Sequence, residues 1–532
     1  MGSLSSFVFV FFFIIVLAFP MKPVSGEALY TESRWVVKEG GGRVKLACVN
    51  WVSHLDTVVA EGLHKQPLDV ISKKIKSMGF NCVRLTWPIY LVTNESLGSL
   101  TVRRSFQNLG LLGAIAGVQA KNPDIIDLPL IKAFQAVVKN LGDNDVMVIL
   151  DNHRTDPGWC CGSTDGNGFF GDEHFDPDLW VQGLTKMATL FRGVPHVVAM
   201  SLRNELRGPR QNVPDWFKYM QRGAEAVHSA NPDVLVILSG LSFDTDLSFL
   251  GGRKPTLTFS KKLVYEAHWY GFTNGKVWVS TNLNQACAQI TGNVMSHSGF
   301  LLGQGFPLFF SEFGMDLTGS NLNDIRYFHC FMALAAELDF DWALWSLVGS
   351  YYYREGVPGT TENYGVLDAE WAQVKNPGFL RRISSLQVPF RGPGVSGGSP
   401  HQVIFHPLTG LCVSRKSGGL EPLALGACSD SEGWNYTNQR IVPVKGRNLC
   451  LQAGQLGKAV KVAGTCSDSD SRWEMISDSK MHLSSKVSDN STVCLDVDSN
   501  NIVVTSACKC LSTDSTCDPT SQWFKFVDST RG

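Results

Sequence analysis

Residues 197–205 read VVAMSLRNE, a mostly apolar run that ends in three polar side chains, Arg203, Asn204 and Glu205. Runs without polar residues at alternate positions are typical of strands buried on both faces of a parallel sheet. Longer amphipathic stretches, such as residues 68–78 and 216–227, separate this run from seven similar ones, at residues 44–49, 82–85, 146–150, 234–238, 263–265, 308–310 and 343–345. Eight such strands in about 300 residues predict an α/β fold, a (β/α)8 TIM barrel.

An open, doubly wound sheet is the alternative fold, but no Gly-rich phosphate loop follows the first strand.

The composition excludes some classes of protein function. The chain has 532 residues, a formal net charge of −1 and 44% hydrophobic residues. These values exclude a disordered chain and argue against a protein that binds nucleic acid through excess positive charge.

The N-terminus predicts a secreted protein. Phe7 to Phe19 is almost wholly apolar but shorter than the ~20 residues that span a bilayer, and the small residues 24–26 follow it. We expect a signal peptide over residues 1–26, cleaved near Gly26, and an extracellular or cell-wall location without membrane contact. An uncleaved anchor is the alternative, because the segment before the apolar run has no Lys or Arg. Sequons at Asn94, Asn435 and Asn490 predict glycosylation on this route.

Cysteine spacing separates a second domain from the first. Eight of the 14 Cys lie after residue 411, and the pairs Cys412/Cys428 and Cys450/Cys466 are each 16 residues apart. A third unit starts at Cys494 and closes near Cys508 or Cys510. This period of about 40 residues predicts stacked copies of one small β unit. We therefore expect a barrel domain over 27–387, a linker or wrapped connecting loop over 388–400 and an all-β domain over 401–532.

The repeats resemble the ricin-B-type β-trefoil carbohydrate-binding module. In that module an Asp two residues after the first Cys binds sugar, and of the three units only the third retains it, as Asp496. The Gln-x-Trp that should end each unit is absent from all three. The resemblance therefore implies one possible sugar site, at Asp496, or else a structural or docking role.

Six Cys lie in the barrel domain, and the sequence leaves their pairing open: Cys48, Cys82, Cys160, Cys161, Cys287 and Cys330. The adjacent Cys160 and Cys161 suggest two separate bridges, or one bridge and one free thiol.

Chemistry in such a barrel is expected at the carboxyl ends of the strands. Eight residues stand at these positions in order: Arg84, His153, Asn204, Glu205, His268, Tyr270, Glu312 and Trp345. Glu205 and Glu312 follow strands three apart, so they are expected to face each other across the mouth. Glycosidic cleavage needs one protonated and one ionised carboxyl group. We expect Arg84 to hold Glu312 ionised and the neighbouring negative charge to raise the pKa of Glu205.

The ordered set resembles glycoside hydrolase family 5, retaining barrel enzymes that include many cellulases and mannanases, over about residues 30–385. The resemblance implies Glu205 as acid/base, Glu312 as nucleophile and a covalent glycosyl-enzyme intermediate. The remaining six residues are expected to bind the substrate: Asn204 the 2-hydroxyl, Trp345 the ring face, Tyr270 the attacking oxygen, with Arg84, His153 and His268 completing the polar network. The stretches 94–120 and 156–162 depart from simpler members, and we expect both near the cleft.

The leading hypothesis is thus a secreted, monomeric glycosidase acting on β-linked wall polysaccharide or glycoside, with no metal and no cofactor. The alternatives are a transglycosylase and a wall lectin whose barrel is inactive. The sequence leaves open the sugar, the linkage and endo or exo action. The candidate aromatic residues for stacking in the cleft are Trp51, Trp87, Trp159, Trp269 and residues 351–353.

Overall fold

The computed structural model describes residues 28–395, 399–415, 422–446 and 448–531. The predicted signal peptide, its cleavage site near Gly26 and residues 396–398 of the predicted linker lie outside the described residues.

Eight parallel strands form a closed barrel in the order β10-β3-β4-β5-β6-β7-β8-β9. They are β3 (Ala47–Trp51), β4 (Cys82–Pro88), β5 (Met147–Arg154), β6 (Val197–Ser201), β7 (Leu235–Leu238), β8 (Leu263–His268), β9 (Leu308–Phe313) and β10 (Asp341–Leu344). Each predicted run overlaps one of these strands. The (β/α)8 barrel is therefore confirmed, and the open sheet is excluded.

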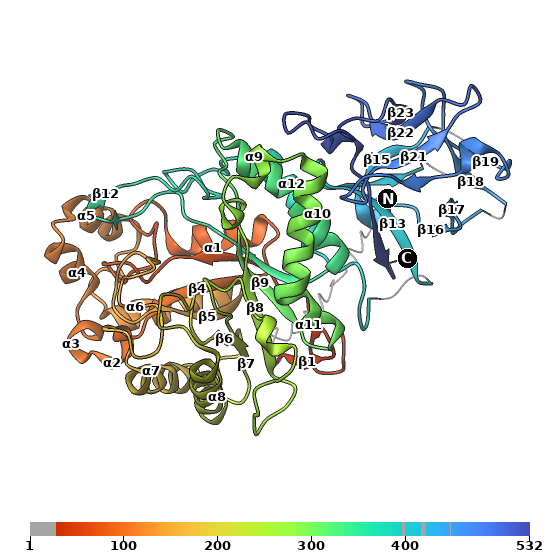
Figure 1. Cartoon of the computed structure of the whole chain (residues 1–532). Helices are drawn as coiled ribbons and strands as arrows, with labels where there is room; N and C mark the ends of the chain where they lie inside the picture. The colour runs from red at the N-terminus through yellow and green to blue at the C-terminus, as the bar shows by residue number, and fades with distance from the viewer. Residues whose placement is uncertain (1–27, 396–398, 416–421, 447, 532) are drawn as a thin grey trace, which may run out of the picture.

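Helices surround the barrel (Figure 1): α1 (Leu68–Ser77), α2 (Tyr90–Thr93), α3 (Glu95–Gly98), α4 (Val102–Asn108), α5 (Leu112–Lys121), α6 (Leu130–Asp143), α7 (Pro177–Leu190), α8 (Val213–Ala230), α9 (Val277–Ser280), α10 (Leu283–Val294), α11 (Phe300–Gly303), α12 (Leu322–Leu338) and α13 (Pro377–Ile383). Side-chain caps fix several starts: Asp176 accepts hydrogen bonds from the first turn of α7, and Asn212 and Asn321 cap α8 and α12 in the same way. Short hairpins lie outside the barrel, β1 (Tyr30–Glu32) with β2 (Trp35–Val37) and β11 (Tyr353–Arg354) with β12 (Val357–Pro358).

The barrel strands are buried on both faces, as their unbroken apolar runs predict. Ile149, Leu235 and Phe309 belong to one buried cluster, and Val148, Val236 and Phe310, their neighbours in sequence, belong to another that includes the helices. This alternation separates an interior core from a strand–helix core.

The disulfides correct one expectation. Cys160 and Cys161 are bonded to each other, so the interpretation as two bridges or as a bridge and a thiol was wrong; it overlooked a bond between neighbours. The other barrel pairs are Cys48–Cys82, which joins β3 to β4, and Cys287–Cys330, which joins α10 to α12. In the C-terminal region the pairs are 412–428, 450–466, 494–508 and 510–517.

The C-terminal region is all-β. Its strands are β13 (His401–His406), β14 (Leu411–Ser414), β15 (Ala424–Gly426), β16 (Trp434–Thr437), β17 (Arg440–Pro443), β18 (Cys450–Gln452), β19 (Lys461–Ala463), β20 (Glu474–Met475), β21 (Leu483–Lys486), β22 (Thr492–Val497), β23 (Val503–Ser506) and β24 (Lys525–Ser529). They form antiparallel sheets beside α10 and α12 (Figure 1). The assignment to a trefoil stays a prediction.

The third Cys unit docks this region on the barrel. Asn282 donates hydrogen bonds to the carbonyls of Cys510, Ser512 and Asp514, and Arg326 of α12 donates to those of Ser515 and Thr516. Because these directional contacts are at least partly buried, the two parts of the chain are joined by more than their connecting segment.

The segment predicted as a linker packs against the barrel up to residue 395. Asp339, at the end of α12, accepts hydrogen bonds from the backbone N–H of Phe390 and Arg391 and pairs with Arg43 and Lys45. Phe390 is 1% exposed. This part of the chain is therefore a wrapped connection.

The stretch 94–120 forms α3, α4 and most of α5, far from the C-terminal region (Figure 1). It packs on the loop after β3, where Ser105 donates to the carbonyl of Thr57, and none of its residues lines the pocket described below. The stretch therefore does not form the pocket wall, and its expected place near the cleft stays a prediction. Across the described ranges, no helix combines the length and apolar character needed to cross a membrane.

Candidate active site

A pocket of about 620 Å³ opens at the carboxyl ends of the barrel strands. Seven of the eight residues singled out from the sequence line it: His153, Asn204, Glu205, His268, Tyr270, Glu312 and Trp345. They come from β5, β8, β9 and the segments after β6, β8 and β10. The barrel topology thus gathers residues that lie far apart in sequence.

The two glutamates face each other. One carboxylate oxygen of Glu205, one of Glu312 and a ring nitrogen of His268 all lie within 4.8 Å of one another. His268 Nδ1 is 3.0 Å from Glu205 Oε1 and 3.8 Å from Glu312 Oε2. These three side chains have the atom types of a metal site, but each already has a partner within the protein.

Arg84 fixes one carboxylate oxygen of Glu312. Its Nη1 is 2.9 Å from Glu312 Oε1, and its Nη2 donates to Asp151 Oδ1 and to Asn204 Oδ1, both at 2.9 Å. Arg84 is wholly buried and does not line the pocket. It therefore orients three site residues at once, and the expectation that it contacts substrate is not met by this placement.

The opposite oxygen of Glu312 is held by a neutral donor. Tyr270 donates to Glu312 Oε2 at 2.9 Å, and burial raises the pKa of Tyr270 well above its usual value. Both oxygens of Glu312 are thus fixed, which sets the direction in which the carboxylate points.

Burial governs the charges of the pair. It raises the pKa of Glu205 to about 7, while Arg207 and Arg84 act against it. Burial also raises the pKa of Glu312, although His268 and Arg84 lower it. The expected rise for Glu205 is present, with burial rather than negative charge as its first cause. For Glu312 the expected stabilising effect of Arg84 is present, but burial outweighs it.

A row of flat side chains leads away from the glutamates. His153 stacks on Trp345 with ring centroids 5.8 Å apart, and His54 stacks on His153 at 4.0 Å. His153 is held by Asp151, whose Oδ2 lies 2.6 Å from Nδ1. Burial lowers the pKa of both histidines well below the usual value, so the row is neutral.

The backbone at Glu205 is unusual and is secured from the neighbouring loop. Glu205 has a φ of 46°, and Ser242, Phe243 and Asp244 have φ values of 55°, 60° and 59°. Left-handed backbone costs about 1–2 kcal/mol per residue without glycine. Asp244 Oδ2 accepts the N–H of Glu205 at 3.0 Å, and the carbonyl of Asp244 accepts the N–H of His268. Strain at these positions is thus tied to the placement of two site residues.

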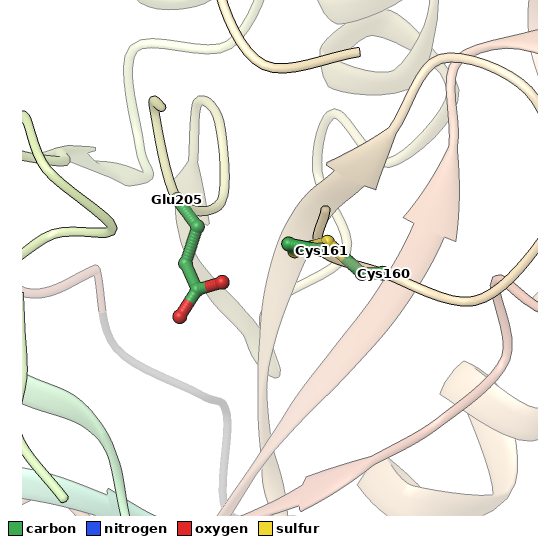
Figure 2. Close-up of side chains that lie close together, drawn as sticks. All are labelled: Cys160, Cys161 and Glu205. Carbon is green, nitrogen blue, oxygen red and sulfur yellow. A yellow bond between two sulfur atoms is a disulfide. The ribbon is translucent and has the colours of Figure 1, made fainter. Parts of the chain in front are cut away.

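The Cys160–Cys161 disulfide adjoins Glu205, as Figure 2 shows. One carboxylate oxygen of Glu205 and both sulfur atoms lie within 4.8 Å of one another. Asn204 Nδ2 lies 3.7 and 3.6 Å from the sulfurs of Cys160 and Cys161. The stretch 156–162 therefore does reach the pocket, as expected.

Several lining residues escaped the sequence analysis: His54, Phe243, Phe272, Arg354, Glu362 and Tyr364. They lie in loops, in the short strand β11 or in a single 3-10 turn, where the sequence has no regular pattern, and only the position of His54 after the first strand offered a signal. Of the aromatic candidates, Trp159 lines the pocket, whereas Trp51 and Trp87 are wholly buried in the core.

Asp496 lies in the docked third unit. Its carboxylate accepts from Gln522 Nε2 at 3.0 Å, pairs with Lys509 Nζ at 3.2 Å, and the residue is 4% exposed. This carboxylate is engaged within the protein.

Comparisons with known proteins agree with this geometry. The family model described as Cellulase (glycosyl hydrolase family 5) matches residues 53–350. A "Glycosyl hydrolase 5 family protein" of Chamaecyparis obtusa is 42% identical over 97% of this chain and 96% of its own. An "Endoglucanase" of Paenibacillus polymyxa is 23% identical over 47% of this chain and 63% of its own. The solved hyperthermophilic endocellulase of Pyrococcus horikoshii has the same fold, with a TM-score of 0.54 and 20% identity over 68% of this chain and all of its own.

Proposed function

This chain belongs to the cellulase family, glycosyl hydrolase family 5, and from that membership and the site we propose a retaining β-glycosidase that uses Glu205 and Glu312. The family makes the protein a glycosidase with a polysaccharide substrate. One observation carries the finer proposal. One carboxylate oxygen of Glu205 and one of Glu312 lie within 4.8 Å of each other, which fits carboxyl groups about 5–5.5 Å apart, as in retaining enzymes, better than the about 6.5–9.5 Å that leaves room for an attacking water in inverting ones.

The two residues take different parts in double displacement. Glu312, fixed by Arg84 and Tyr270, attacks the anomeric carbon as the bond to the leaving oxygen breaks, and an ester forms. Glu205 gives its proton to that oxygen, which its raised pKa of about 7 favours. Glu205 then takes a proton from water, which attacks the same carbon and releases Glu312.

The substrate class is proposed as β-glucan, because relatives such as that of Paenibacillus polymyxa carry the name endoglucanase. Trp345 supports the sugar face, and Asn204 is placed beside Glu205 to bind the 2-hydroxyl. A panel of glucans, mannans and mixed-linkage chains, with product sizing, tests this choice.

Secretion is proposed from the N-terminus and is supported by the disulfides and sequons. All seven disulfides fit an oxidising compartment, and Asn94, Asn435 and Asn490 are exposed. N-terminal sequencing of protein from the medium of expressing cells should begin close to residue 27, with glycan-dependent mass.

The mechanism is tested by Glu205→Gln and Glu312→Gln. We expect Glu312→Gln to lose about 10³-fold or more in kcat on every substrate. Glu205→Gln should lose about 10²–10⁴-fold on glucan but much less on aryl glycosides whose leaving group needs no proton. Azide should rescue Glu205→Gln as a β-glycosyl azide. Wild-type turnover in Glu312→Gln contradicts the assignment, and glycan binding with no turnover in the wild type supports an inactive lectin.

Transglycosylation is a second candidate, favoured by Phe272. This aromatic ring is 60% exposed at the pocket and stacks on Tyr270 with centroids 4.8 Å apart. A sugar acceptor bound there competes with water in the second step. Product analysis with added oligosaccharide distinguishes transfer from hydrolysis.

A further inference from the structure

One side of the pocket is lined by a contact between two segments that follow barrel strands. Trp159 follows β5, and Arg354 follows β10; the guanidinium carbon of Arg354 lies 3.5 Å from the indole centroid. Glu362 Oε2 lies 3.3 Å from Arg354 Nη1 and accepts from Tyr351 at 2.5 Å. A cation stacked on Trp and held by a buried carboxylate is a defined contact. Since β3 and β4 separate β10 from β5 in the barrel, it bridges that side of the mouth.

The disulfide continues this wall toward the acid. Cys160 and Cys161 directly follow Trp159 and line the pocket up to Glu205 (Figure 2). Beyond them, Arg207 Nε donates to the carbonyl of Gly162 at 3.0 Å, and Arg207 Nη1 donates to that of Glu205. The wall from Arg354 to Glu205 is thus anchored at both ends.

Another part of the pocket wall carries an exposed aromatic residue. Phe272 lies there, 60% exposed, on the segment after β8. Phe243, from the loop after β7, lines the same side, and its N–H donates to the carbonyl of Leu206, next to Glu205. An exposed aromatic face beside the acid suits the leaving part of a sugar chain.

The proposed mechanism determines which end of the sugar chain lies at each side of the pocket. Trp345, the floor for the sugar that reacts, and Arg354 both lie on the chain after β10, which places that sugar toward the Trp159–Arg354 contact. Glu205 protonates the leaving oxygen, and the loop of Phe243 is attached next to it, so the leaving group lies toward Phe243 and Phe272. The non-reducing side of the reacting sugar therefore faces the Trp159–Arg354 contact.

Resting on the proposed glycosidase function, we propose that the enzyme acts at chain ends, removing one sugar at a time from the non-reducing end. A chain cleaved internally needs room for further sugars beyond the reacting one, and the Trp159–Arg354 contact occupies that path. Phe272 then binds the second sugar.

The test uses β-1,4-linked gluco-oligosaccharides labelled at the reducing end, together with a soluble β-glucan. The first labelled product from a pentasaccharide should be the tetrasaccharide, with free monosaccharide, while the viscosity of the polymer changes little. Shorter labelled products in the first turnovers, or a rapid fall in viscosity, overturn the proposal.

Two variants test the closing contact. Trp159→Ala and Arg354→Ala should open the pocket wall at this contact, so that the ratio of single-sugar release to internal cleavage falls about tenfold, an effect of the size that one or two lost contacts produce. Arg222→Ala, which removes an exposed partner of Asp178, should keep the wild-type pattern. An unchanged pattern in both pocket variants, with unchanged melting temperature, contradicts a barrier at this contact.

A binding measurement separates this proposal from the proposed function. Glu312→Gln should bind the free pentasaccharide but bind at least about 50-fold more weakly when a bulky benzylidene group blocks its non-reducing end, because the Trp159–Arg354 contact excludes added volume. Equal binding of both forms overturns chain-end action alone. No turnover by the wild type and no binding of either form, nor of mannan and mixed-linkage oligomers, overturns the glycosidase proposal as well.

Discussion

The carboxyl group of Asp244 accepts the backbone N–H of Glu205 at 3.0 Å, so that a buried acid after β7 holds the residue proposed as acid/base after β6. Asp244 itself lies in a left-handed segment with Ser242 and Phe243, and Glu205 is also left-handed. Backbone in this region persists only where its surroundings determine it. Asp244 is therefore a positioning residue for Glu205.

Replacing Asp244 tests this role. Asp244→Ala leaves the N–H of Glu205 without its partner and frees the segment, so kcat should fall about 10- to 100-fold with little change in KM. Burial raises the pKa of Asp244 well above its usual range, which favours the neutral acid, so Asp244→Asn should retain most activity. Asp246→Ala, on the same loop but outside the pocket lining, is the matched control. Equal kcat in Asp244→Ala and the control would contradict a positioning role for Asp244.

The fall of kcat/KM at alkaline pH should follow the deprotonation of Glu205. The acid must be protonated, and burial raises its pKa to about 7, so kcat/KM should decline as the pH rises through about 7. Arg207 is the charge that most lowers the pKa of Glu205. Arg207→Gln also removes the shorter of the two ion pairs of Asp165, leaving Arg154 at 3.5 Å, and both effects raise the pKa of Glu205. The alkaline limb should therefore move to higher pH by about one unit. A pH–rate profile with an unmoved or acid-shifted limb contradicts Glu205 as the titrating acid.

The barrel could be predicted because its strands are buried on both sides, which leaves unbroken runs such as residues 197–202 in the sequence. The same pattern placed Asn204, Glu205 and Glu312 at strand ends, since the topology alone brings strand ends together. It could not give the bond between Cys160 and Cys161 or the Trp159–Arg354 contact. These depend on how irregular loops fold onto one another, and no periodicity records that.

The ion cluster at Asp339 should support stability. Its carboxylate, 1% exposed, pairs with Arg43 and Lys45 and accepts two backbone N–H groups from the connecting segment. Asp339→Ala leaves two buried cations unpaired and should cost about 3–5 kcal/mol in the free energy of unfolding. Asp127→Ala, at the exposed pair with Arg103, should leave the melting temperature nearly unchanged. Equal melting temperatures in the two variants, measured by calorimetry, would contradict the role of the cluster.

Asn284 joins the C-terminal region to the barrel, and its loss should loosen that joint without touching the chemistry. Its Oδ1 accepts from Trp523 Nε1 at 2.9 Å and from Ser479 Oγ at 2.8 Å, and its Nδ2 donates to the carbonyl of Cys510. Asn284→Ala leaves a buried indole N–H unsatisfied, so docking should weaken by about 1–3 kcal/mol. The C-terminal region should then be released faster by limited proteolysis, while kcat/KM on oligosaccharides stays at the wild-type value because the pocket lies at the barrel mouth.

The control variant is Asn293→Ala, on the same helix. It removes a side chain that has no hydrogen bond to the described part of the C-terminal region, and it should behave as wild type. A fall in kcat/KM on polymer alone would show that the docked region presents the chain to the barrel, whereas unchanged proteolysis would contradict the joint.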